Sequence, residues 1–417
     1  MIIERPRYLQ QLISLRHNGM IKIVTGIRRC GKSFLLSTLF TNWLKEQGID
    51  QDHIIDINLE DRRNKRLRDP DELLTFIDSH LKDDRMHYIM IDEIQLVPDF
   101  EDVLNSYLNK GNADVYVTGS NARFLSSSIK TEFAGRGDEI RLYPLSFSEF
   151  SSIKTSDKIE NLREYMIYGG MPQVVMRETE KEKSSFLECL FQRTYIRDIV
   201  LRYNIKNTDV LDELLNILAS AIGSLTNPTK LVNTFASVKH EKVTRPTLSA
   251  YLEYLCESFL IEKSCQYDIK GKKYIHSPYK FYFTDCGLRN ARLNFRQIEF
   301  THLMENAIYN ELCIRGYSVD VGIVHKQERT EGDNRIRRHY EVDFVCNQGS
   351  KRYYIQSAFK MTDENKIKQE EKSLRNIDDS FKKIIVLGEP TPVIRNESGI
   401  TIISIYDFLL NENSLDL

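Results

Sequence analysis

The chain has 417 residues, of which 41% are hydrophobic and 28% are charged, and this ordinary globular balance excludes an intrinsically disordered protein. A single hydrophobic core seldom grows to this length, so we expect two or three domains. The formal net charge of −2 excludes a strongly basic chain, and any binding to DNA would therefore depend on local patches.

Strands alternate with helices over residues 1–145. The sequence predicts strands at 21–25, 53–58, 88–91, 115–118 and 139–142, and helices from 31 onward, over 71–82 and over 99–110. The run 88–91 is apolar throughout, as expected for a strand that is buried on both faces of a parallel sheet. This order predicts an α/β fold with a mostly parallel sheet covered by helices on both faces.

The pattern changes after Pro144. Residues 146–208 are rich in helix formers and predict a helical lid, and residues 209–295 predict a winged-helix-like domain. In the latter, Thr244 would cap a recognition helix over 245–257.

The wing of that domain would consist of two β-rich segments, 260–267 and 280–284, joined by a turn at 270–273. Residues 296–417 predict a further α/β domain. Its expected elements are a helix over 299–315, strands near 317–325, 339–346 and 352–357, a polar helix over 363–376 and a strand over 383–387.

Seven cysteines are spread along the chain, and none forms a Cys-x-x-Cys pair. This pattern indicates neither a disulfide framework nor a zinc site, and it fits reduced thiols. The first residues have no apolar stretch of signal-peptide length, and no apolar run approaches the length of a membrane span. We therefore expect a soluble cytoplasmic protein without a membrane partner.

The segment after the first expected strand matches the pattern G-x-x-x-x-G-K-[ST], which is the P-loop of nucleotide-binding proteins. The residues expected to bind ATP are Gly26, Ile27, Arg28, Arg29, Cys30, Gly31, Lys32, Ser33 and Phe34. The glycines let the backbone N–H groups approach phosphate oxygens, and the helix that follows offers unpaired N–H groups and its positive dipole end.

Within this loop, Lys32 would reach the β- and γ-phosphates and take part in catalysis, and Ser33 would be a ligand of Mg²⁺. The preceding strand and the apolar helix after it supply the structural context that the pattern requires. Arg28 and Arg29 would either contact phosphate or only be exposed.

Two carboxylates follow the apolar run 88–91. Asp92 and Glu93 stand at the C-terminal end of a strand, where open α/β sheets bind their ligands. Asp92 is expected to hold the Mg²⁺ shell, and Glu93 to polarise the attacking water as the general base. The alternative for such a pair is a solvated strand end.

Small polar residues end the strand 115–118. Ser120 or Asn121 would sense the γ-phosphate or orient the water, or alternatively cap a helix. Arg136, in the stretch Phe-Ala-Gly-Arg-Gly, is a candidate arginine finger, supplied in cis or by a neighbouring subunit of a homo-oligomer. Its alternative is a surface salt bridge.

These motifs together resemble a known family, the bacterial and archaeal AAA-type ATPases that end in a restriction-endonuclease-like domain of unknown function. The matching stretches are Thr25–Leu36, Ile89–Leu96, Thr118–Asn121, Ala134–Arg136, Leu142–Phe150, Tyr168–Pro172, Tyr195–Val200, Tyr282–Arg289 and Glu341–Phe344. The resemblance implies a five-stranded ATPase core, a helical lid, a winged helix and a C-terminal nuclease-like fold. It supports the roles given above to Lys32, Ser33, Asp92 and Glu93, and also those of Ser120, Asn121 and Arg136.

Nucleases of the fold that the resemblance implies carry an acidic residue on one strand and Glu-x-Lys on the next, and their acids hold Mg²⁺. Glu341 and Asp343 lie on one side of an expected strand, and Glu305 on the preceding helix could join them. On the following strand, however, Gln356 stands where Glu is expected and Ala358 where Lys is expected.

Lys360 would replace the missing lysine only through a local bulge. We therefore predict a degenerate nuclease-like site that serves to bind nucleic acid or protein. The alternative for its acidic residues is an exposed polar strand face.

A basic surface of the winged helix would meet phosphates. The residues in question are Lys239, Lys242, Arg245, Lys270, Lys272 and Lys273. The alternative is a purely structural lid subdomain.

The function that we predict is a Mg²⁺-dependent ATP-hydrolysing switch or motor with a DNA-binding appendage. The alternatives are a scaffold or regulatory protein that binds ATP without turnover, and an ATP-gated nuclease.

Overall fold

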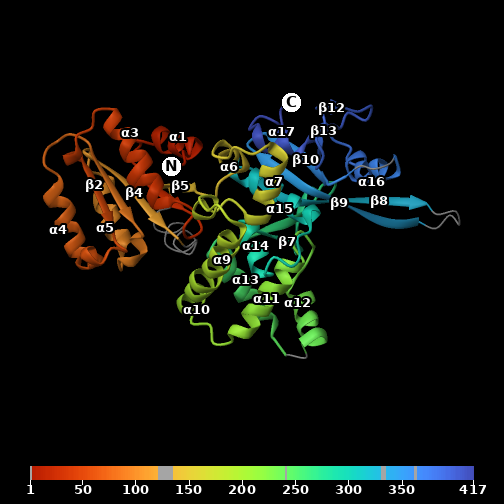
Figure 1. The fold of residues 1–417 in the computed structure, drawn as a ribbon, viewed down its shortest axis with the longest axis horizontal. Coiled ribbons are helices and arrows are strands. Elements are labelled where there is room, and N and C mark those ends of the chain that lie inside the picture. The colour runs from red at the N-terminus through yellow and green to blue at the C-terminus, as the bar shows by residue number, and fades with distance from the viewer. Residues whose placement is uncertain (1, 121–134, 240–241, 330–334, 361–363) are drawn as a thin grey trace. The chain divides into compact units, whose positions relative to one another are not determined.

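The computed structural model describes residues 2–120, 135–239, 242–329, 335–360 and 364–417 (Figure 1). The chain divides into two compact units. The first comprises Met1–Pro144 and Glu257–Phe259, and the second comprises Leu145–Cys256 and Leu260–Leu417. The mixed α/β fold class predicted from the sequence is confirmed, with a parallel five-stranded sheet in the first unit and a strand-rich second unit.

The sheet of the first unit has the strand order β2-β3-β4-β1-β5, and all its neighbouring strands are parallel. The strands are β1 (Ile21–Thr25), β2 (Ile54–Asn58), β3 (His87–Asp92), β4 (Ala113–Gly119) and β5 (Gly137–Arg141). Each coincides within two residues with a strand predicted from the sequence. The order places β1 at an inner position between β4 and β5, so the loop that leaves β1 is flanked by the ends of two strands.

Helices cover both faces of this sheet, as the apolar strands require. One face packs through buried aliphatic side chains on α4 (Pro70–His80) and α5 (Phe100–Leu108). On the other face the ring of Phe40 lies 4.7 Å from that of Tyr116 and 6.3 Å from that of Tyr88.

Phe40 belongs to a continuous helical run that follows the P-loop. The run consists of α2 (Lys32–Phe34), a π-helical segment (Leu35–Phe40) and α3 (Thr41–Glu46), and α1 (Pro6–Ser14) precedes β1. Short helical turns occupy Gln51–His53, Arg62–Arg68 and Ile94–Leu96.

A buried ion pair crosses the sheet between β1 and β4. Lys22 donates to the carboxylate of Asp114, and both side chains are almost fully buried. Tyr116 donates to the same carboxylate over 2.7 Å, and the backbone N–H of His17 does so over 3.2 Å. The carboxylate therefore has partners for both oxygens, as a buried charge requires.

Removing one member of this pair leaves an uncompensated buried charge. We expect Asp114→Ala to lower the free energy of unfolding by about 3 kcal/mol. Asp50→Ala removes a partner of Arg85 at an exposed pair, where both side chains are about two-thirds exposed, and serves as the matched control. Its expected cost is below ~1 kcal/mol. Urea denaturation of both variants checks this, and equal losses would contradict the role given to the buried pair.

The second unit begins with a series of helices. They are α6 (Phe147–Ser152), α7 (Lys158–Tyr168), α8 (Pro172–Val175), α9 (Glu180–Leu190), the π-helical segment Phe191–Ile196, α10 (Arg197–Arg202), α11 (Thr208–Ser220), α12 (Pro228–Thr234), the π-helical segment Phe235–Lys239 and α13 (Arg245–Glu257). The hydroxyl oxygen of Thr244 accepts from the backbone N–H of Thr247 over 3.3 Å, so the predicted cap of α13 is confirmed.

An eight-stranded sheet follows, in the order β12-β13-β11-β10-β9-β8-β6-β7. Its strands are β6 (Ile261–Asp268), β7 (Lys273–Phe283), β8 (Ser318–Arg329), β9 (Arg335–Gln348), β10 (Lys351–Ala358), β11 (Lys382–Leu387), β12 (Ile394–Arg395) and β13 (Thr401–Ser404). The helices of this part are α14 (Cys286–Arg292), α15 (Phe300–Ile314), α16 (Glu364–Arg375) and α17 (Ile405–Leu410).

The hairpin predicted as a wing differs from that prediction in two respects. Its second strand, β7, begins at Lys273 instead of residue 280. Strands β6 and β7 pair antiparallel as expected, but β6 also pairs in parallel with β8 over Gln266–Asp268. The hairpin therefore forms the edge of the eight-stranded sheet. The domain boundary predicted at residue 295 does not divide this sheet, because β6 and β7 belong to it together with β8. Alternate side chains of β6 are buried, and a hairpin of two strands alone would not bury them. The pairing of β6 with β8 accounts for this burial.

Two of the family-like stretches, 168–172 and 282–289, pack against each other inside the second unit. The buried carboxylate of Asp285 accepts from the backbone N–H of Gly170 over 2.7 Å and from that of Leu288 over 3.0 Å. A Cβ on Gly169, whose φ is +74°, would meet this carboxylate at 2.1 Å. Gly169 is thus required by both backbone conformation and close contact. A Cβ on Gly170 would lie 2.2 Å from the carbonyl oxygen of Leu145, which accounts for the second glycine.

Candidate functional site

The predicted P-loop connects β1 to α2 and turns sharply. Gly26 and Gly31 have φ values of +148° and +110°, and Arg29 has a φ of +66°. A Cβ on Gly26 would lie 2.1 Å from the carbonyl oxygen of Leu142. The loop therefore rests directly on the backbone that leaves β5, and a side chain at this glycine does not fit.

Lys32 is buried, and its ammonium group points back into the loop. Its Nζ donates to the carbonyl oxygens of Gly26 over 3.0 Å and of Ile27 over 3.3 Å. These acceptors are neutral, and a charge-assisted bond to an anion is about twice as strong as one to a neutral group. A phosphate oxygen would therefore compete well for this ammonium.

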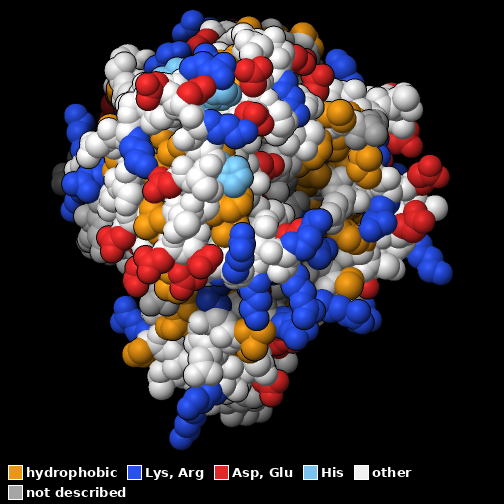
Figure 2. Space-filling model, turned by 90° about the vertical axis from the view of Figure 1, so that its left-hand side faces the viewer, with side chains coloured by type: hydrophobic (Ala, Val, Ile, Leu, Met, Phe, Trp, Pro, Cys, Tyr) orange, Lys and Arg blue, Asp and Glu red, His pale blue; other side chains and the backbone are white. Residues whose placement is uncertain are grey.

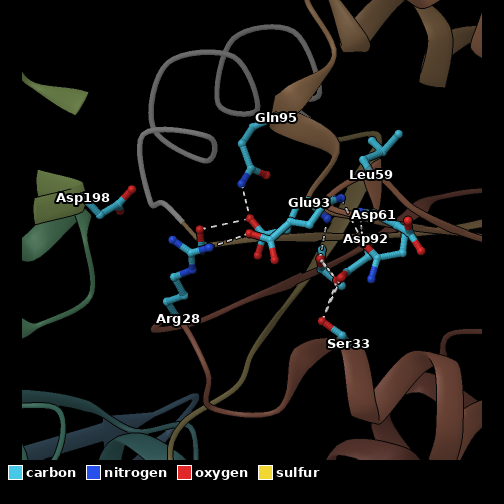
Figure 3. Close-up of polar contacts among 12 residues, drawn as sticks. Arg28, Ser33, Leu59, Asp61, Asp92, Glu93, Gln95 and Asp198 are labelled. Atoms are coloured by element: carbon cyan, nitrogen blue, oxygen red, sulfur yellow. Dashed lines mark hydrogen bonds and ion pairs between the residues drawn. The ribbon is translucent and has the colours of Figure 1, made fainter. Parts of the chain in front are cut away.

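Ser33 and Asp92 lie next to each other at the start of α2 and the end of β3. The Ser33 hydroxyl is 2.8 Å and 2.9 Å from the two carboxylate oxygens of Asp92. Figure 3 shows the two side chains pointing toward each other. Thr118, at the end of β4, donates to Asp92 over 2.6 Å. Burial raises the pKa of Asp92, and the hydrogen bonds from Thr118 and Ser33 oppose that rise.

The Ser33 hydroxyl and the Asp92 carboxylate are oxygen ligands of the kind that Mg²⁺ prefers, and they contact each other directly. The residues present thus fit a Mg²⁺–nucleotide complex.

Glu93 is held in an uncommon backbone conformation, with a φ of +58°. Its backbone N–H donates to Thr118 Oγ1 over 2.9 Å. Its carboxylate accepts from the Ser120 hydroxyl over 3.1 Å and from the side-chain amide of Gln95, which Figure 3 shows pointing toward it. A non-glycine residue in this region is strained, and such strain persists only where surrounding contacts hold it.

The other predicted nucleotide ligands differ in their surroundings. Ile27 and Cys30 are buried and support the loop. Arg28 pairs with Glu60 over 2.6 Å in a half-exposed setting, and Arg29 is exposed.

Phe34, on the first turn of the helix, is 39% exposed. Asn121 lies outside the described residues, so of the two predicted sensors only Ser120 is placed.

Arg136 lies near the N-terminal end of β1, whereas the P-loop follows the C-terminal end of that strand. Its carbonyl oxygen accepts from the backbone N–H of Ile21, at the start of β1, whereas the P-loop follows Thr25 at the other end. The strand between them spans about 13 Å at ~3.3 Å a residue. Its exposed guanidinium contacts only the amide oxygen of Asn105, at 3.5 Å, among the described residues. This position is too far from the P-loop of the same chain for Arg136 to act as an arginine finger in cis.

Three residues of the site escaped the sequence-based prediction. Thr118 is the last residue of the predicted strand 115–118, and Gln95 lies two residues after Glu93, but neither received a role. Arg5 lies before α1, far from any motif, and is almost fully buried. It donates to the carbonyl oxygens of Cys30 over 3.3 Å and Tyr143 over 2.8 Å, and so ties the P-loop to the segment after β5. Only the unusual burial of an arginine signals it.

The predicted nuclease-like residues also come together, in the second unit. Glu305 on α15 and Glu341 and Asp343 on β9 surround the ammonium group of Lys280, which lies on β7. Gln356 on β10 has its amide oxygen 3.4 Å from the backbone nitrogen of Asp343.

Strand β10 pairs with β9 and β11 without a register shift and ends at Ala358. Lys360 is exposed beyond that end, so the bulge that would have brought it into the site does not form.

Known proteins share these features. A family model described as an AAA domain matches residues 18–151, and a second model, a domain of unknown function, matches residues 159–299. A Walker-type ATPase of Pyrococcus abyssi has the same fold with a TM-score of 0.50 and 16% sequence identity, over 70% of this chain and 96% of that one. The fold and the site therefore define an AAA-type P-loop protein.

The particular family follows from full-length relatives. A protein of Haemophilus influenzae, described as uncharacterized, is 34% identical over 418 residues, which cover 98% of this chain and 99% of the relative. An uncharacterized protein of Methanocaldococcus jannaschii is 28% identical over 88% of this chain and 84% of the relative. The chain belongs to the same family as the Haemophilus influenzae protein.

Among the described residues, no helix combines the length and the apolar character that crossing a membrane requires. Figure 2 shows acidic and basic side chains intermixed over the face that it draws, in keeping with the net charge of −2.

The close contact at Gly26 gives a direct test of the P-loop. We expect Gly26→Ala to weaken ATP binding at least tenfold, because the added Cβ collides with the carbonyl of Leu142 and displaces the loop. Gly111→Ala is the matched control, since nothing lies within 4 Å of its added Cβ, and it should bind ATP as wild type does. Titration with a fluorescent ATP analogue measures both, and unchanged affinity in Gly26→Ala would place the nucleotide elsewhere.

Proposed function

We propose that this protein hydrolyses ATP in a Mg²⁺-dependent reaction and that the bound nucleotide acts as a conformational switch. The observation that carries the proposal is the polar network that joins the carboxyl ends of β3 and β4 to the P-loop helix through Ser33, Asp92 and Thr118. Ligands bind at this edge of open α/β sheets. The AAA domain match supports the same assignment.

The P-loop residues would bind the triphosphate. Backbone N–H groups of the loop and of the first turn of the helix face the phosphate oxygens, and Lys32 contributes its ammonium group. Ser33 and Asp92 would hold Mg²⁺, which when bound neutralises charge on the β- and γ-phosphates. Ser33 and Asp92, which hydrogen-bond to each other, would both be available to hold the ion.

Glu93 would take the proton from the attacking water. Its carboxylate follows the metal-binding Asp92 directly, and Ser120 and Gln95 fix its orientation. The amide oxygen of Gln95 is buried and has no hydrogen-bond partner among the described residues. It is a suitable acceptor for the second hydrogen of that water, so Gln95 and Ser120 would act as positioning residues.

We expect Glu93→Gln to lower ATP turnover at least 100-fold, because the amide cannot accept the proton, while ATP affinity stays within about threefold. Glu46→Gln, at the exposed end of α3, is the matched control and should turn over ATP at the wild-type rate. Phosphate release and analogue titration measure the two quantities. If Glu93→Gln turns over ATP like the control, Glu93 is not the base.

The same assay separates the proposal from its non-enzymatic alternative. If wild type binds ATP but releases no phosphate, with or without duplex and single-stranded DNA, then the chain is a nucleotide-bound scaffold.

We further propose that Arg136 acts as an arginine finger in trans, within a homo-oligomer. Its exposure and its position at the edge of the sheet opposite the P-loop support a role toward a second copy of the chain. A finger in this role contributes several orders of magnitude to turnover.

Arg136→Ala should therefore lower turnover at least 100-fold with nearly unchanged ATP affinity. Mixing it with Glu93→Gln should restore part of the activity, because the second variant supplies the finger and the first supplies the base. Unchanged turnover in Arg136→Ala argues against a finger, and a mixture that stays inactive argues against action in trans.

The exposed side chains at the β6–β7 turn make DNA the partner that we propose. Lys270, Lys272 and Lys273 are exposed there beside Tyr274, a residue that is 57% exposed, and this combination suits a phosphate backbone and its bases. Helix α13, by contrast, carries Arg245 as its one basic residue. The turn rather than the helix would therefore contact DNA, and a measured stimulation of ATP turnover by DNA would support this proposal.

A further inference from the structure

The acidic cluster of the second unit already contains a cation. The Nζ of Lys280 lies 2.9 Å from a carboxylate oxygen of Glu305, 2.7 Å from one of Glu341 and 3.6 Å from one of Asp343. The Lys280 side chain is only 2% exposed. Lysine offers three N–H donors and no acceptor, so this arrangement uses the ammonium group as a point of attachment for three acidic side chains.

The distances are those of an ammonium ion rather than of a metal. Bonds of about 2.7–2.9 Å are typical of N⁺–H···O⁻ contacts, whereas Mg²⁺ holds its oxygens at about 2.0–2.1 Å. The carboxylates of Glu305 and Glu341 are thus placed to accept hydrogen bonds from Lys280. Burial alone would lower the pKa of Lys280, but the carboxylates of Glu305, Asp343 and Glu341 outweigh it and raise the pKa, so the side chain stays charged.

Two further donors hold the acidic side chains of the cluster. Tyr282 donates its hydroxyl over 2.7 Å to the same Glu305 oxygen that faces Lys280, and the backbone N–H of Ser357 donates over 2.8 Å to the second oxygen of Asp343. Gly223 comes so close to Glu305 that a Cβ there would lie 2.9 Å from the carboxylate. The acidic side chains are therefore fixed around Lys280 from several elements of the second unit.

We propose that the Lys280 ammonium is a built-in cation that takes the place of a divalent metal ion among Glu305, Glu341 and Asp343, so that the cluster binds no metal while Lys280 is present. Without Lys280 the three carboxylates face one another with no counter-charge, which is the donor set that Mg²⁺ and Mn²⁺ prefer. Glu341 is 38% exposed, so an ion from solvent has access to the cluster.

The inference concerns the second unit alone and does not depend on ATP hydrolysis. It removes the metal that the ATP-gated nuclease would need. It also gives Lys280 a structural task, because the lysine joins β7 at the sheet edge to α15 and β9.

Mn²⁺ binding to the nucleotide-free full-length chain, followed by electron paramagnetic resonance, tests the proposal. Wild type should show no site in the cluster, and Lys280→Ala should gain one Mn²⁺ per chain with at least tenfold higher affinity than any wild-type binding. Lys270→Ala, which removes an exposed lysine of the same hairpin, should behave like wild type. Adding Asp343→Asn to Lys280→Ala should abolish the new site.

Two outcomes would overturn the proposal. One is a folded Lys280→Ala chain, judged by a circular dichroism spectrum and a thermal unfolding transition like those of wild type, that gains no Mn²⁺. The other is a wild-type chain that binds one Mn²⁺ and loses it in Asp343→Asn, and this second measurement needs no substitution at Lys280.

Discussion

The buried carboxylate of Asp92 is the group on which the arrangement of the nucleotide site depends. It accepts from Ser33 at the start of the P-loop helix and from Thr118 at the end of β4, so one side chain joins three elements. Transfer of a carboxylate from water into the protein interior costs free energy unless its oxygens accept hydrogen bonds. The residues that pair them are therefore fixed in place before any nucleotide binds, and the strained backbone of Glu93 is held through the same threonine.

The P-loop has a second anchor behind it. Gly26 lies against the carbonyl of Leu142, and Arg5 bonds to the carbonyls of Cys30 and Tyr143 on either side of that contact. A loop whose N–H groups must face phosphates has its carbonyls directed the other way, and these need donors. Arg5 donates to one of them, that of Cys30, and to the carbonyl of Tyr143 behind the loop, so the loop is held in place without any ligand being required.

Sequence alone was sufficient for the parts of the molecule that local pattern determines. The five strands of the first unit, the P-loop and the pair Asp92 and Glu93 follow from periodicity, glycine spacing and strand ends. The hairpin at 261–283 was predicted as a hairpin, but its parallel pairing with β8 was not, because the partner lies some fifty residues further on and no local signal specifies it. For the same reason Lys280 was assigned to a wing, although the acidic residues around it were identified.

A comparison of two buried lysines, Lys32 and Lys280, shows why one site suits an anion and the other does not. Lys32 donates to two neutral backbone carbonyls, which a phosphate would displace with a gain in charge–charge attraction. Lys280 donates to carboxylates, and a phosphate entering there would meet like charge while leaving two or three carboxylates without their cation. The same side chain is thus poised for ligand binding when its acceptors are neutral and committed to the fold when they are charged.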